Sequence, residues 1–164
     1  MPKTPVEVLA EIERAFPKNP IDMDRAFSDW GKGYMDVRLY KGFAHGRTWD
    51  ALDVRTLETR DDALGFLSAQ ALADILPAAL AALVGPGSPH RAFPYALAVI
   101  LKRPTPDRDD GLGTQRFEAL WERLNLDQRR AVGAALRCFV EAHPESGPAE
   151  TLGDALDSCW GSVS

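Results

Sequence analysis

Three acidic residues have the spacing of a calcium-binding loop. Asp107, Asp109 and Glu118 fall at positions 1, 3 and 12 of an EF-hand pattern, between two predicted helices. That pattern requires an oxygen ligand at position 5 and a glycine at position 6. The sequence has Gly111 and Leu112 there instead. Because these two positions do not fit the pattern, we predict a solvated acidic loop. We expect no metal ion and no other cofactor.

The histidines and the glycine-rich turn form no reactive cluster in the sequence. His45, His90 and His143 are widely separated and each lies near a predicted turn, and His143 suits the negative end of a helix. The turn Gly85-Pro86-Gly87-Ser88 lacks the Gly-Lys-Ser/Thr ending of a phosphate-binding loop. The sequence therefore assigns no catalytic, cofactor-binding or metal-binding residue.

A set of dispersed acids is the alternative basis for an enzyme. Asp61 and Asp62 precede a predicted helix, and Asp74 stands inside an otherwise apolar one. A carboxylate within an apolar helix needs a hydrogen-bonding or charged partner. An acid whose pKa is perturbed by such surroundings is a candidate for a functional site. These acids name no reaction, so we lean away from an enzyme and keep it as the alternative.

The basic residues offer only a thin surface for nucleic acid, and Arg91, Lys102, Arg103 and Arg108 surround one predicted loop. Arg129, Arg130 and Arg137 lie close together on one predicted helix, but the formal net charge is −5. An acidic protein repels phosphate, so we expect a solvated face and no nucleic-acid partner.

Length and composition predict one all-α domain over residues 1–164. Hydrophobic residues make up 45% and charged residues 26% of the chain, the mixture of an ordinary globular protein. Alanine and leucine supply about a quarter of the residues, and both lose little on entering a helix. We expect a compact domain of about seven or eight helices.

The central helix of that domain is predicted from Ser68 to Val84, with Pro77 inside it. It is apolar nearly all round, as buried helices are. The uninterrupted apolar run from Ile75 is ten residues, whereas a membrane span takes about 20, so we expect no membrane contact.

The other predicted helices follow from caps and periodicity. Thr4 and Glu7 form a capping box with Pro5 at the first helical position, and Asn125 with Gln128 repeats the pattern. Residues 34–47 fit a strand or a helix equally well. Further helices are expected from Asp22 to Gly31, after Thr48, over Phe93–Leu101, after Thr114, and from Pro148 to about Trp160.

The two cysteines are expected to be reduced thiols. On consecutive antiparallel helices, Cys138 and Cys159 would be offset by about 10 Å, which is too far for a disulfide. Residues 1–5 contain no apolar segment of a signal peptide. Both observations predict a cytoplasmic protein.

Three different apolar motifs and a final helix follow one another along the chain. They are Gly46-Arg47-Thr48-Trp49, Leu64-x-Phe66-Leu67-Ser68 and Leu76-Pro77-Ala78-x-Leu80, with a last helix that closes on Leu156 and Trp160. Over residues 43 to 160 the chain resembles a family of small bacterial proteins of unknown function, with a Leu-Pro-Ala step inside a leucine-rich helix. The aromatic pair that this family often places before that step is Asp74-Ile75 here. The resemblance implies an all-helical fold, and it supplies no reaction, cofactor or catalytic residue that could be carried over to this chain.

These observations favour a non-catalytic protein-binding module of the bacterial cytosol. Its specific form is an immunity protein that neutralises a toxin by covering it. Residues 47–84 and 127–164 each carry six acids and three bases, so they would form an acidic patch for a basic partner if they pack together. The third class, a structural or homo-oligomeric protein, would show exposed Trp or Phe at its interface.

Overall fold

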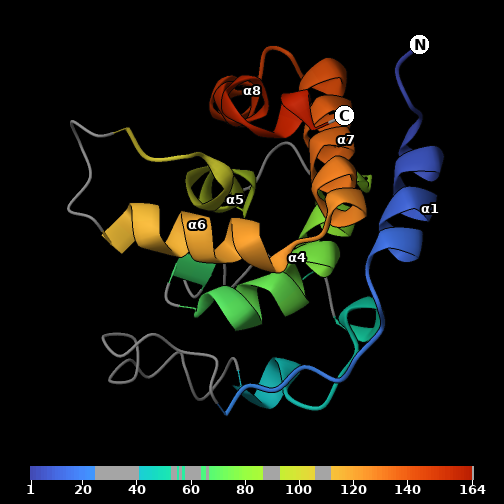
Figure 1. Ribbon diagram of the computed structural model, residues 1–164. Coiled ribbons are helices and arrows are strands. Elements are labelled where there is room, and N and C mark those ends of the chain that lie inside the picture. Colours follow the sequence, from blue (N-terminus) through green and yellow to red (C-terminus); the bar gives the residue numbers. More distant parts are fainter. Residues whose placement is uncertain are drawn as a thin grey trace.

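The computed structural model describes residues 1–24, 41–52, 55, 57, 64–65, 67–86, 93–105 and 112–163. Within these ranges the protein is all-α, as the composition predicts (Figure 1). The elements are α1 (Pro5–Ala15), the 3₁₀ helix η1 (Trp49–Ala51), α4 (Ala69–Val84), α5 (Phe93–Leu101), α6 (Leu112–Arg123), α7 (Leu126–Ala142), α8 (Gly147–Ser158) and the 3₁₀ helix η5 (Trp160–Ser162).

Two capping boxes begin α1 and α7, and both confirm the prediction. The Thr4 hydroxyl accepts from the Glu7 N–H, while the Glu7 carboxylate accepts from the Thr4 N–H at 2.7 Å. Asn125 and Gln128 exchange the equivalent bonds, each at 2.9 Å. These bonds satisfy N–H groups that have no partner within the helix. In α1 the fully buried side chains are Val8 and Ile12.

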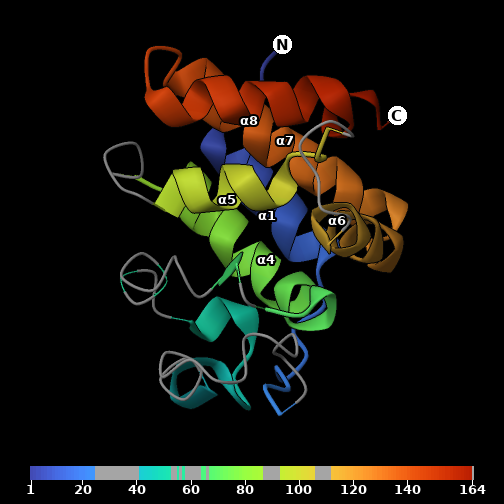
Figure 2. The same ribbon diagram turned by 90° about the vertical axis from the view of Figure 1, so that its left-hand side faces the viewer.

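The apolar helix α4 forms the centre of the fold. The helix extends to Val84 as predicted, and the Ser68 hydroxyl caps it by accepting from the Ala71 N–H at 3.3 Å. Eleven of its sixteen residues are buried, and it packs against α1, α6 and α7. Figures 1 and 2 show these helices around it. No helix in the described part of the chain is both long and apolar enough to cross a membrane.

Near the end of the described chain, the side chain of Trp160 is buried in the hydrophobic core. This tryptophan is 1% exposed, and its indole N–H donates to the carbonyl of Leu101 at the end of α5 over 2.8 Å. Its ring packs on Trp121 and Phe117, with centroids 4.8 and 6.1 Å away. These contacts hold α8 across α5 and α7, where it forms one outer edge of the molecule (Figure 2).

Two helix starts differ from their predictions. Helix α6 begins at Leu112, so Thr114 is its third residue and was wrongly predicted as its cap. Thr48 does precede a helix, but η1 is a single 3₁₀ turn and the Thr48 side chain makes no capping bond to its backbone. Of the ambiguous stretch, residues 41–44 are helical. Gly46 follows with φ +73°, a left-handed conformation that glycine adopts without strain.

Candidate functional site

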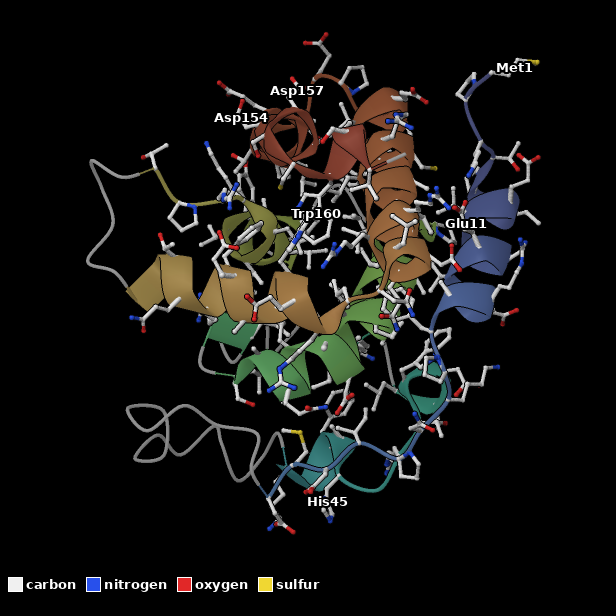
Figure 3. All side chains as sticks on the ribbon, in the orientation of Figure 1. Met1, Glu11, His45, Asp154, Asp157 and Trp160 are labelled. Atoms are coloured by element: carbon white, nitrogen blue, oxygen red, sulfur yellow. The ribbon has the colours of Figure 1, made fainter. Side chains whose placement is uncertain are left out.

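The outward face of α8 carries a row of carboxylates. Glu150, Asp154 and Asp157 are spaced by four and three residues, which places them one above another on a helix. All three are exposed, and Asp154 and Asp157 point away from the body of the molecule in Figure 3. Leu152 and Ala155 lie on the opposite face and are fully buried. We call Glu150, Asp154 and Asp157 the α8 acidic face.

Little positive charge offsets this face. Residues 138–164 contain five acids and no lysine or arginine. The cation paired with the face among the described residues is Lys102, whose Nζ lies 2.8 Å from Asp154. That carboxylate still keeps 55% of its side chain exposed, so the pair is a surface ion pair that leaves Asp154 accessible.

The acids of residues 47–84 lie elsewhere, as far as the structure describes them. Asp50 belongs to η1, at the end of the molecule opposite α8 (Figures 1 and 2), and pairs with Lys18 at 3.0 Å. Asp74 lines a separate pocket. Residues 47–84 and 127–164 do pack together, through α4 and α7. This contact is apolar, and it does not join the described acids of the two segments into one patch.

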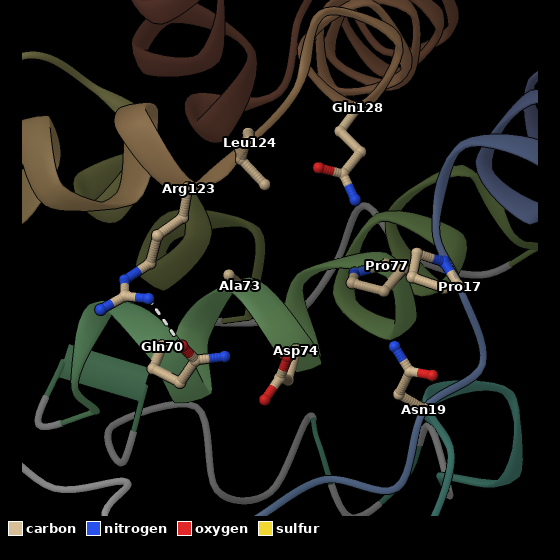
Figure 4. Close-up of a pocket in the computed structure, with 9 residues that line it drawn as sticks. All are labelled: Pro17, Asn19, Gln70, Ala73, Asp74, Pro77, Arg123, Leu124 and Gln128. Atoms are coloured by element: carbon tan, nitrogen blue, oxygen red, sulfur yellow. Dashed lines mark hydrogen bonds between the residues drawn. The ribbon is translucent and has the colours of Figure 1, made fainter.

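Asp74 lies in a polar pocket of about 330 Å³ (Figure 4). The Arg123 guanidinium donates to Gln70 Oε1 at 2.6 Å, and the Gln70 side chain lies between Arg123 and Asp74 in Figure 4. Burial raises the pKa of Asp74, while the Gln70 hydrogen bond and the Arg123 charge act in the opposite direction. The lining comes from three parts of the chain: Pro17, Asn19, Gln70, Ala73, Asp74, Pro77, Arg123, Leu124 and Gln128.

The sequence alone singles out Asp74 but not its partners. Asn19 and Arg123 are about fifty residues or more from it in the chain, so no local spacing connects them. The other two acids of the alternative enzyme site, Asp61 and Asp62, lie outside the described residues.

A second polar cluster, also missed by the sequence patterns, joins Asp22, Asp24 and His45. Their ligand atoms lie within 4.8 Å of one another, and all three residues are exposed. The Met23 N–H donates to His45 Nδ1 at 3.1 Å, so the neutral ring carries its proton on Nε2. Asp24 forms an ion pair with Lys41, and its N–H donates to Asp22. These interactions link the chain around Asp22 to the chain around His45. Because the side chains already have these structural partners, we assign no metal ion to the cluster.

The calcium-loop residues are only partly described. Asp107 and Asp109 lie outside the described residues. Glu118 forms an ion pair with Arg103, whose guanidinium also lies over the Phe117 ring. It belongs to the second turn of α6. Its carboxylate therefore has a structural partner.

Arg129 is part of the fold and does not belong to a basic surface. Its guanidinium donates two hydrogen bonds to the Trp121 carbonyl, at 2.7 and 3.2 Å, and lies 4.4 Å from the Trp121 ring. The prediction of a solvated arginine was wrong for this residue. Arg130 and Arg137 are exposed, as expected.

The remaining candidate residues have structural positions. Cys138 and Cys159 are buried free thiols, and burial raises the pKa of both. His143 is the C-cap residue of α7. His90 lies outside the described residues. Trp49 and Trp160 are buried and Trp121 is half-buried, so no described tryptophan is exposed as an oligomer interface would require.

Comparison of the chain with protein-family models, with curated proteins and with solved structures finds no match.

Proposed function

We propose that this protein is a non-catalytic binding module of the bacterial cytosol that holds a basic protein partner against the α8 acidic face. In its specific form the partner is a toxin, and the chain is the immunity protein that covers it. One observation carries the proposal: Glu150, Asp154 and Asp157 form one exposed row opposite the buried face of α8.

The support is electrostatic. Exposed charges of one sign steer a partner of opposite charge and suppress wrong partners. Apolar packing against α5 and α7 holds the helix backbone in place, so the carboxylates are presented on a preformed surface. The resemblance to small bacterial proteins agrees with a cytosolic bacterial setting but adds no partner.

The test compares two double variants of equal charge. Glu150→Lys with Asp157→Lys reverses the α8 acidic face, and Glu13→Lys with Glu122→Lys reverses two exposed acids on α1 and α6. Each pair removes two negative charges and adds two positive ones, which changes the formal net charge from −5 to −1. Any difference between them therefore reflects position and not net charge.

The wild-type chain and both variants are used as baits in lysate of the source organism. A basic protein should be captured by the wild type and the control pair and lost by the α8 pair. The purified complex should weaken by about tenfold or more in the α8 pair, and its Kd should rise with salt. Toxicity of the partner, relieved by co-expression, would establish the immunity role. Equal capture by all three baits, or a Kd insensitive to salt, would contradict the proposal.

A further inference from the structure

The pocket around Asp74 lies where three segments of the chain meet. Gln70, Ala73, Asp74 and Pro77 share one face of α4, by their three- and four-residue spacing. The chain after α1 forms one wall, and the junction of α6 and α7 forms another (Figure 4). Polar groups that converge on a concave site from separate elements are typical of small-molecule binding.

Two opposite charges in this pocket are separated by one amide group. Gln70 accepts from the Arg123 guanidinium through Oε1 at 2.6 Å. The Gln70 side chain lies between the Arg123 guanidinium and the Asp74 carboxylate in Figure 4. A ligand that contacts both Arg123 and Asp74 must therefore carry its own opposite charges only a few atoms apart.

Backbone chemistry adds an acceptor beside Asp74. Pro77 lies inside α4 and has no N–H, so it cannot donate to the carbonyl of Ala73, four residues earlier. Both residues line the pocket. The Ala73 carbonyl therefore lacks its usual partner within the helix.

On the opposite wall, Gln128 adds a donor. Its Oε1 accepts from the Asn125 N–H in the capping box of α7. Its amide nitrogen points into the pocket in Figure 4. The donors Arg123 and Gln128 thus lie on either side of the acceptor Asp74 in Figure 4.

We propose that this pocket binds a small zwitterion of the α-amino-acid class. The ammonium group contacts the Asp74 carboxylate, and the carboxylate contacts the Arg123 guanidinium. Pro17, Pro77 and Leu124 supply apolar surface for the rest of the ligand. This site is separate from the α8 acidic face and does not depend on the function proposed above.

The test titrates the full-length protein with each proteinogenic L-α-amino acid, at millimolar concentration, by isothermal titration calorimetry. At least one should bind saturably. Its N-acetyl derivative and its methyl ester, which each lack one of the two charges, should bind about tenfold or more weakly. No saturable binding by any amino acid, or a derivative that binds as tightly as its parent amino acid, would overturn the proposal.

Variants locate the site. Arg123→Gln and Asp74→Asn should each weaken binding by about tenfold or more, while Arg130→Gln, which removes an exposed arginine outside this pocket, should leave it within about threefold. Circular dichroism checks that each variant is folded, and the exposed Arg123 side chain can be replaced without opening the core. Wild-type affinity in the folded Arg123→Gln variant would overturn the proposal.

Discussion

Gly133 in α7 lies directly against the backbone carbonyl oxygen of Trp160. A Cβ atom added to Gly133 would come within 2.5 Å of that oxygen. The oxygen belongs to the backbone of η5, so it cannot swing away as the end of a flexible side chain can. Gly133 therefore allows η5 to approach α7 and lets the buried Trp160 ring reach the core.

Replacing Gly133 with alanine should destabilise the fold. The gain in helix propensity is about 1 kcal/mol, and forcing η5 away from α7 costs more, so we expect a net loss of about 1–2 kcal/mol in urea unfolding. Gly153→Ala in α8 is the matched control, because its Cβ would meet nothing within 4 Å. That control should gain up to about 1 kcal/mol. A stabilised Gly133→Ala variant would contradict the role of the close approach.

Trp160→Phe should cost more stability than Trp49→Phe. The Trp160 indole donates to the Leu101 carbonyl at 2.8 Å, and its loss leaves a buried acceptor without this bond, at about 1–3 kcal/mol. The Trp49 indole lies 3.4 Å from the Phe16 carbonyl, a longer and weaker bond. Urea denaturation monitored by circular dichroism measures the difference. Equal losses would show that the Leu101 bond contributes little.

Structural features that depend on a few residues close together in the chain can be predicted from the sequence. Thr4 with Glu7, and Asn125 with Gln128, act within one turn, so both capping boxes were found. The contact of Gly133 with Trp160 and the proximity of Asp22 and Asp24 to His45 depend on tertiary packing across twenty residues or more. No spacing rule covers them. Arg129 was misinterpreted for the same reason, because its partner is a backbone carbonyl, which every residue offers.

Arg129→Lys should be destabilising although it keeps the charge. Lysine lacks the planar fork that donates twice to the Trp121 carbonyl and stacks on its ring, so we expect a loss of about 1 kcal/mol. Arg130→Lys is the control, since Arg130 is an exposed residue paired with Asp127 at 3.5 Å. It should change the free energy of unfolding by less than about 0.5 kcal/mol. Thermal and urea unfolding of both variants measure this.

Cys138 and Cys159 should react slowly with a thiol reagent in the folded protein. Each is 8% exposed, and burial raises the pKa of both thiols, which lowers the fraction of reactive thiolate. Both should react rapidly once the protein is unfolded in urea, so that two thiols per chain are labelled. Reducing agent should leave Tm unchanged. Fast labelling of the native protein at either position would contradict this burial.

Asp74 should make the fold less stable as pH rises through its titration. Its folded-state pKa is raised, chiefly by burial, so between the unfolded and folded values the native state binds more protons than the unfolded state. The slope of unfolding free energy with pH is then negative for this group. Its destabilising effect is absent below the unfolded pKa and fully present above the folded one.

Asp74→Asn removes this titration and keeps a side chain of the same shape. The variant should therefore be more stable than the wild type at neutral pH, and the difference should shrink as pH falls through the folded pKa of Asp74. Urea unfolding of both proteins at a series of pH values measures the difference directly. Asp24→Asn is the opposite control, because the hydrogen bond from Lys41 lowers the pKa of Asp24. That variant should lose stability at neutral pH, and its difference from the wild type should disappear toward acid.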